Sequence, residues 1–326
     1  MYSRIIFVCS ILSILLFSAC EEEITVNLPQ GEEKVVVEGK IENDENPLIL
    51  LTKNIPYFAA LSPAELNNIW VKNAKVSIFD GKDTIKMQEI VVSKKDSVLT
   101  ITIDGDTLPF PVPIPLDVPE GYQYVAYTNL TYKGILGRIY DLQIKTADNK
   151  TITARTTIPT PVLPDSVYFQ VADTTNTVFI GDSCKAEFDA KNLMRLTIDF
   201  KDPENSAEYY RYMTSDDGFS YNANSNSNFT LSSVFGGQKV YGVWLQRIGA
   251  RNEDRQCRDY VFKGDTVHLK WGNIDKAHYD FWDTYRNNVQ GGGPFSPPIY
   301  VKSNIKGGLG YWGGYGRIII KDLVAQ

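Results

Sequence analysis

Hydrophobic and polar residues alternate with a period of two along most of this chain, in short segments that are separated by turn residues. The segment Lys34–Ile41 combines such alternation with an apolar run, and Asp80-Gly81 is a typical turn. Seven further strands are predicted in the first half: Leu48–Thr52, Ala74–Phe79, Ile85–Val92, Ser97–Ile103, Tyr122–Leu130, Ile139–Thr146 and Thr151–Thr156. About eight strands of this kind predict a β-sandwich over residues 34–158.

The second half is also β-type, and it follows a proline-spaced segment. Prolines at 159, 161 and 164 favour an extended joint, so we place a domain boundary at residues 159–164. Residues 165–326 are predicted to form a second β-rich domain, either a sandwich or a small barrel. Its predicted strands are Ser166–Val171, Lys185–Phe200, Glu208–Met213, Lys239–Arg247 and Asp265–Trp271.

Two helices interrupt the strands. Ser62-Pro63-Ala64-Glu65 has the sequence of a capping box with proline at the first helical position. The helix that it begins either caps an open end of the first sandwich or contributes to a contact surface. The second helix is predicted over Ile274–Val289. Five of its apolar residues fall on one face, which either packs against the core or serves as a ligand platform: Ala277, Phe281, Trp282, Tyr285 and Val289.

The first 19 residues have the layout of a secretory signal: Arg4, an apolar run from Ile5 to Phe17, and the small residues Ser18 and Ala19. The run is too short to span a bilayer. The next residue is Cys20, the position at which a lipobox places the thiol that receives a diacylglycerol. Phe17 departs from that pattern, which usually has an aliphatic residue there. The alternative is ordinary cleavage that leaves a free thiol on the first residue of the mature chain. In either case residues 20–33 are expected to form an acidic tether.

Charge and cysteine content narrow the partners and the compartment. The net charge is −6 and becomes −7 when Arg4 leaves with the signal, which argues against nucleic acid as a partner. Two cysteines remain beyond Cys20 in the mature chain, Cys184 and Cys257. In an oxidising compartment they form either one disulfide, which contributes about 4 kcal/mol in the chain-entropy model, or two buried thiols.

The search for catalytic groups returns few candidates. The two histidines, His268 and His278, have no cysteine or carboxylate nearby at metal-ligand spacing, so we expect neither a metal nor another cofactor. Asp199 and Asp202 are either solvated groups at a strand edge or a carboxylate pair for glycoside hydrolysis. We therefore expect a protein that is not an enzyme.

A run of glycines and aromatic residues near the C-terminus is a candidate for binding. Glycines between 307 and 316 permit tight bends with exposed rings at Tyr311, Trp312 and Tyr315, and Phe295 lies in a proline-rich segment just before. The alternative is ordinary packing in a strand with bulges.

The same segment carries a family resemblance. Residues 293–298 and 303–315, with Val37-Glu38-Gly39 and residues 52–58 near the start, resemble motifs of a Bacteroidota outer-membrane lipoprotein family known only as a domain of unknown function, the 4249 family. The resemblance spans residues 24–320. It implies an Ig-like, carboxypeptidase-regulatory-like first domain and a TonB-dependent outer-membrane β-barrel as partner.

Two further features are similar to proteins of that phylum. Acidic residues after the lipidated cysteine, here Glu21, Glu22 and Glu23, imply export to the outer face of the outer membrane. Six tripeptides resemble its O-glycosylation sequon, although Asp-Thr before a β-branched residue is also how a strand leaves a turn. The acceptor residues are Thr84, Ser97, Thr107, Ser166, Thr174 and Thr266.

The sequence thus predicts a lipid-anchored protein with two β-rich domains on the cell exterior. Its expected role is that of an accessory subunit of a TonB-dependent transporter or another outer-membrane complex. The first alternative is a stand-alone protein that captures a glycan or peptide. The second is an envelope hydrolase, which predicts convergent carboxylates with a strongly shifted pKa.

Overall fold

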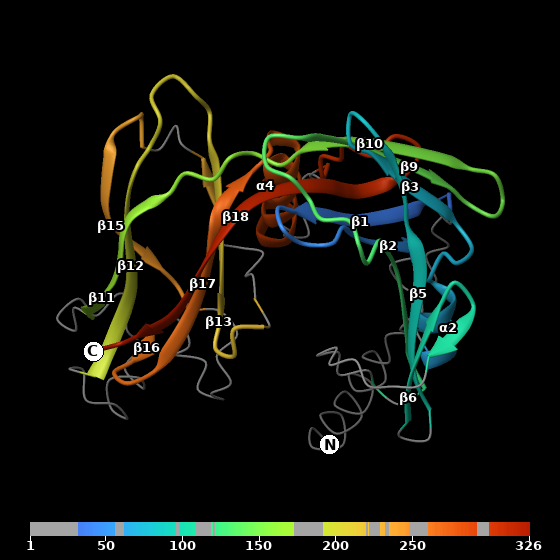
Figure 1. Cartoon of the computed structure of the whole chain (residues 1–326), viewed down its shortest axis with the longest axis horizontal. Helices are drawn as coiled ribbons and strands as arrows, with labels where there is room; N and C mark the ends of the chain where they lie inside the picture. The colour runs from blue at the N-terminus through green and yellow to red at the C-terminus, as the bar shows by residue number, and fades with distance from the viewer. Residues whose placement is uncertain are drawn as a thin grey trace, which may run out of the picture. The chain divides into compact units, whose positions relative to one another are not determined.

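The computed structural model describes the chain in segments, of which residues 33–326 form one compact unit (Figure 1). The described residues are 32–55, 62–95, 98–108, 119, 121–172, 192–219, 221, 229–231, 235–247, 260–291 and 300–326. Their secondary structure is mainly β, as the alternating pattern predicts.

The largest sheet has ten strands drawn from both halves of the chain. Their order is β14 (Phe229–Leu231), β13 (Tyr209–Ser215), β17 (Thr266–Ile274), β18 (Leu309–Val324), β1 (Val35–Glu42), β2 (Leu48–Lys53), β8 (Gln123–Thr128), β5 (Gln88–Lys95), β6 (Val98–Ile103) and β7 (Asp106–Leu108).

Two four-stranded sheets accompany the large one. The first has the order β10 (Thr151–Thr157), β9 (Ile139–Lys145), β3 (Lys75–Phe79) and β4 (Thr84–Lys86). The second consists of β11 (Pro164–Val171), β12 (Leu193–Lys201) and β15 (Lys239–Leu245), with β16 (Val261–Phe262) also paired to β12. Among the described strands no sheet closes into a barrel, so the barrel alternative is wrong and the sandwich-like alternative holds.

The first core lies between the large sheet and the β10-β9-β3-β4 sheet. Alternation in β1 turns Val35, Val37 and Ile41 inward, and alternation in β9 turns Tyr140, Leu142 and Ile144 inward. All six belong to one buried cluster, which joins the two sheets face to face. A second cluster joins β12 to β13 and β17 around Phe200, Tyr210 and Trp271.

The strand β18 begins with the run of glycines and aromatic residues, so the alternative of packing in a strand holds and the expectation of tight bends with exposed rings is wrong. It pairs in parallel with β1 and antiparallel with β17. Glycine is required where β18 approaches β1: a Cβ on Gly310 would lie 2.0 Å from the carbonyl oxygen of Val37, and the φ of Gly310 is +95°. The glycines therefore permit close backbone contact rather than exposure of the rings.

Both predicted helices are present. Helix α2 (Pro63–Asn68) begins with the predicted capping box, in which the Ser62 hydroxyl accepts from the Glu65 N–H and the Glu65 carboxylate accepts from the Ser62 N–H. Helix α4 (Lys276–Gly291) packs Phe281 and Trp282 against Tyr311, while Val289 in its last turns is 56% exposed. The predicted stripe is thus a packing face in its first half only.

The proline-rich segment runs along β17 before it enters β11. The Val162 N–H donates to Asn273 Oδ1, and Trp271 Nε1 donates to the Val162 carbonyl, both at 2.8 Å. The parallel pair of β1 and β18 joins strands from before and after this segment. The pairing of the chain's first and last described strands is what builds the site described next.

Candidate functional site

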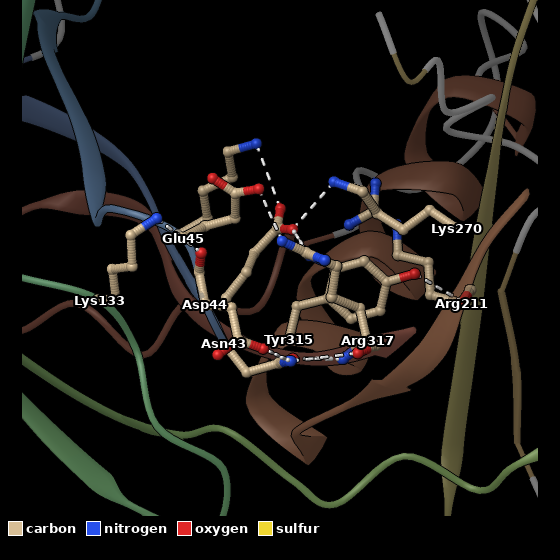
Figure 2. A network of polar contacts seen from close by, with 10 residues as sticks. Asn43, Asp44, Glu45, Lys133, Arg211, Lys270, Tyr315 and Arg317 are labelled. Atoms are coloured by element: carbon tan, nitrogen blue, oxygen red, sulfur yellow. Dashed lines mark hydrogen bonds and ion pairs between the residues drawn. The ribbon is translucent and has the colours of Figure 1, made fainter. Parts of the chain in front are cut away.

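A network of buried charges lies where β1, β17 and β18 meet (Figure 2). Its centre is Glu42, the last residue of β1, which is 3% exposed. The Glu42 carboxylate accepts from Lys270 Nζ of β17 at 2.9 Å and from Arg317 Nε of β18 at 3.1 Å. Lys40 Nζ, at the solvent side, contacts the other carboxylate oxygen at 3.3 Å.

The three cations fix the ionisation state of Glu42. Burial alone raises the pKa of this carboxyl, but the charges of Lys40, Lys270 and Arg317 outweigh it and hold the pKa at about 2. Burial also lowers the pKa of Lys270. Glu42 is therefore an ionised hydrogen-bond acceptor at neutral pH. Its role is structural, because its ion pairs link β1 to β17 and β18.

Arg317 extends the network to the residues that follow β1. Its N–H donates to Asn43 Oδ1 at 2.7 Å, and its carbonyl accepts from Asn43 Nδ2 at 3.2 Å. Its guanidinium also donates to Glu45 at 2.6 Å, where the Glu45 side chain is half-exposed. Asp44 between them has a φ of +59°, and its carbonyl accepts from Lys133 Nζ. Arg317 thus fixes the turn after β1.

A third buried cation, Arg211 of β13, lies beside this network. It is 5% exposed. Its Cζ lies 4.6 Å from the centre of the Trp282 ring, and its Nη1 lies 2.9 Å from His278 Nε2. Burial, followed by the charge of Arg211, lowers the pKa of His278 to about 3, so the ring is neutral. Because Arg211 can only donate, Nε2 of His278 accepts and the ring proton is on Nδ1, which faces the Gly314 carbonyl.

A pocket of about 500 Å³ opens beside Arg317 and the turn after β1. Its polar lining consists of Asn43, Asp44, Thr160 and Arg317, and its apolar lining consists of Leu136, Pro161, Leu163, Ile318 and Ile319. Leu136 and Leu163 are 40% and 64% exposed. The pocket therefore has a charged base, which the Glu42 network holds in place, and an apolar rim of Leu136 and Leu163.

A family model described as "Domain of unknown function (DUF4249)" matches residues 21–317. The chain belongs to this family. The match confirms the resemblance to the 4249 family that was inferred from the motifs, and it includes every residue of the Glu42 network up to Arg317. No curated protein and no solved structure matches the chain. Among the described residues of this DUF4249 chain, no helix is long and apolar enough to cross a membrane.

The aromatic residues predicted for binding in this DUF4249 chain are buried instead. Tyr311, Trp312 and Tyr315 are 7%, 0% and 2% exposed. Trp312 Nε1 donates to the Tyr140 carbonyl at 3.2 Å, Tyr311 stacks on His278, and the Tyr315 hydroxyl donates to the Arg211 carbonyl at 2.9 Å. The expectation of exposed rings is therefore wrong and the alternative, packing within a strand, holds. The rings are buried because Trp312 belongs to the first core and Tyr311 packs against α4.

Several predicted site residues lie outside the described residues: Cys20, Glu21, Glu22, Glu23, Ser97, Thr174, Cys184, Cys257 and Phe295. Of the other glycosylation candidates, Thr84, Thr107 and Ser166 are exposed and Thr266 is half-buried. Lipidation, the disulfide and glycosylation therefore stay predictions.

The carboxylates considered for hydrolysis each have a separate set of donors. Asp199 accepts from Ser166, Tyr168 and Gly242, while Asp202 accepts from Tyr210 and Gly237.

Burial raises the pKa of Asp275, whose carboxylate caps α4 by accepting from the His278 N–H at 2.8 Å. In the described part of the chain, no three His, Cys, Asp or Glu side chains are grouped as metal ligands.

Sequence reasoning missed the Glu42 network, although a signal for it exists. Lys270 stands between Leu269 and Trp271 in a strand whose two faces are both buried. A charged residue inside such a run has to meet an opposite charge, because an unpaired buried charge is costly. Which residue supplies that charge could not be inferred, since Glu42 is 228 residues away in sequence.

Proposed function

We propose that this DUF4249 protein is a lipoprotein of the outer membrane, held by acyl chains on Cys20 and facing the cell exterior. It is not an enzyme but an accessory subunit of a TonB-dependent transporter or another outer-membrane complex. The apolar rim of Leu136 and Leu163, beside the pocket over Arg317, is its contact for that partner.

The observation that carries this proposal is the exposure of large apolar side chains around one pocket. Single exposed leucines are ordinary, but apolar side chains that gather at a hollow mark contact sites for other proteins. An arginine at the base of an apolar pocket is also typical of an interface centre. Here Glu42 and Glu45 hold Arg317 in place before any partner arrives, which lowers the cost of ordering it on binding.

The identity of the partner as a membrane protein rests on the N-terminal sequence. Acyl chains contribute about 0.8 kcal/mol for each buried methylene, so a chain with several of them stays in the bilayer. A protein confined in this way meets the loops of integral β-barrels at high local concentration. In the sequence, residues 20–33 separate Cys20 from the first described strand.

Co-purification from detergent-solubilised native membranes tests the proposal. The tagged full-length protein is expected to co-purify with an outer-membrane β-barrel. The variant L136D/L163D is expected to co-purify with at least ten-fold less of that β-barrel. The variant L130D is the matched control, because Leu130 is 52% exposed but does not line the pocket.

The outcomes separate the two parts of the proposal. If no β-barrel accompanies the wild-type protein, the partner assignment fails. If L136D/L163D retains the β-barrel as well as L130D does, the partner binds elsewhere and the pocket is not the contact.

A further inference from the structure

The outward face of the β10-β9-β3-β4 sheet carries a second, different surface. Side chains of these strands alternate between the first core and solvent, and the pairing aligns the outward ones in rows. One row is Arg155, Asp141, Phe79 and Thr84, and the next is Thr153, Gln143, Ser77 and Lys86. We call this surface the basic sheet face. Figure 1 shows β10, β9 and β3 lying side by side.

A groove of about 750 Å³ lies over the first row and over Thr153, Gln143 and Ser77 of the second row, and Lys86 follows Ser77 just outside it. Asn304 and Lys306 form one of its walls. The backbone of Lys306 pairs with that of Thr153, at 3.1 Å and 2.8 Å, and Asn304 Nδ2 donates to the Arg155 carbonyl at 3.0 Å. The outer edge of β10 is therefore already paired at Thr153, so a ligand on this face meets side chains and does not add a strand there.

The charge of the basic sheet face is opposite to that of the whole protein. Its outward side chains and the Lys306 wall supply five cations, Lys75, Lys86, Lys145, Arg155 and Lys306, and one carboxylate, Asp141. The face thus has a net charge of +4, whereas the chain has −6. Within the described segments, none of the four lysines forms an ion pair, so their charges remain available to a ligand.

The polar groups of the groove suit a ligand rich in hydroxyl groups. Arg155 donates to Asp141 through Nε at 2.5 Å and a terminal nitrogen at 2.8 Å, which fixes both planar groups and leaves three of the five guanidinium N–H donors. Gln143, Ser77 and Thr153 add further donors and acceptors. Phe79, which is 42% exposed, offers a ring face in the same row.

We propose that the basic sheet face binds an acidic saccharide, an oligosaccharide whose carboxylate or sulfate groups pair with the lysines while one sugar ring packs on Phe79. The excess of cations selects the anionic groups, and the amides, hydroxyls and aromatic ring select a saccharide over other anions. This site is separate from the apolar rim, so the inference does not depend on the membrane partner proposed above.

Fluorescence anisotropy with labelled oligogalacturonate, a carboxylated saccharide, tests the inference on the full-length protein in neutral detergent. Oligogalacturonate is expected to bind at least ten-fold more tightly than maltohexaose, its neutral counterpart. The double variant K86S/K306S is expected to weaken binding at least ten-fold and to reduce its dependence on salt. The control K201S/K263S removes two exposed lysines elsewhere and is expected to change the affinity less than two-fold.

A third variant separates a saccharide site from a merely charged surface. F79S leaves all charges in place and is expected to weaken binding about five-fold, because stacking on an aromatic ring contributes about 1 kcal/mol. Its salt dependence is expected to match that of the wild type. Urea unfolding of each variant verifies that the fold is retained.

Four results would overturn the inference. They are equal binding of maltohexaose, equal effects of K86S/K306S and K201S/K263S, unchanged affinity of F79S, and binding of phosphatidylglycerol vesicles without binding of oligogalacturonate. The last would assign the face to a lipid surface. Co-purification of the β-barrel by K86S/K306S is expected to equal that of the wild type, so this test and that of the proposed function fail independently.

Discussion

Glu42 shows how one residue can hold distant parts of a chain together. Its carboxylate accepts from side chains of β17 and β18, so three strands share one buried negative charge. Removing one partner of such a set is more costly than removing an exposed ion pair, because the remaining charges stay buried.

The substitution Glu42→Gln is expected to lower the free energy of unfolding by about 3–5 kcal/mol, since Lys270 and Arg317 lose their buried counter-charge. Urea unfolding at pH 7 measures the effect. Glu45→Gln is the matched control: Glu45 also pairs with Arg317 but is 51% exposed, so its loss is expected to cost about 0–1 kcal/mol. Equal costs for the two variants would contradict the central role of Glu42.

The lowered pKa of Glu42 also predicts how stability depends on pH. The folded pKa is about 2 and the ordinary value is 4.5, so the ionised form stabilises the folded state above that ordinary value. The contribution is lost progressively as the pH falls from about 4.5 to about 2. Unfolding measured at pH 7, 4 and 3 is expected to show a smaller decrease for Glu42→Gln than for the wild type. A parallel decrease in both would show that other carboxyls account for the acid sensitivity.

At the scale of elements, β18 depends on glycines in its neighbour as well as its own. Gly39 of β1 lies opposite Trp312, and a Cβ on Gly39 would approach Trp312 Cε3 to 2.7 Å. The indole fills the space that the missing side chain leaves. The contact joins the family motif near the start of the chain, Val37-Glu38-Gly39, to the motif near its end.

Gly39→Ala is therefore expected to destabilise the protein by about 1–3 kcal/mol through overpacking. The measurement is urea unfolding of G39A, W312F and the double variant G39A/W312F. Because the smaller phenyl ring relieves the clash, the double variant is expected to lose less than the sum of the single losses. Strictly additive losses would mean that the methyl group and the indole do not meet.

Elements with local signals were predictable from the sequence, and elements that depend on distant partners were not. The capping box located α2, and alternation located β1, β9 and β10 to within a residue or two. For β18 the sequence left a strand and tight turns as alternatives, because its glycines indicate turns locally, whereas their role is to admit the backbones of β1 and of residues 157–159. Only the fold reveals that use of glycine.

At the scale of the whole molecule, the Glu42 network and its pocket could not be predicted either, because they too depend on residues that are distant in sequence. The Glu42 network and the pocket bring together residues from near 43, 136, 161 and 317, and no spacing along the chain relates these segments. The basic sheet face depends less on distant residues, since Lys75, Lys145 and Arg155 alternate with buried residues in strands that the sequence predicts. What the sequence lacked was the pairing of strands that turns separate lysines into one surface.

The proposed attachment of the folded unit to a membrane concerns the whole molecule, and it depends on one sulfur atom, that of Cys20. We expect Cys20→Ser either to release the protein into the soluble fraction or to block its maturation, because serine cannot accept the thioether-linked lipid. Fractionation and intact mass measure both outcomes, and the wild-type mass is expected to exceed that of residues 20–326 by its acyl chains. Cys9→Ser is the matched control, since Cys9 lies in the predicted signal and its replacement is expected to leave location and mature mass unchanged. If the Cys20→Ser protein keeps the wild-type mature mass and stays in the membrane fraction, the anchor is elsewhere and the outer-membrane role proposed for the chain loses its main support.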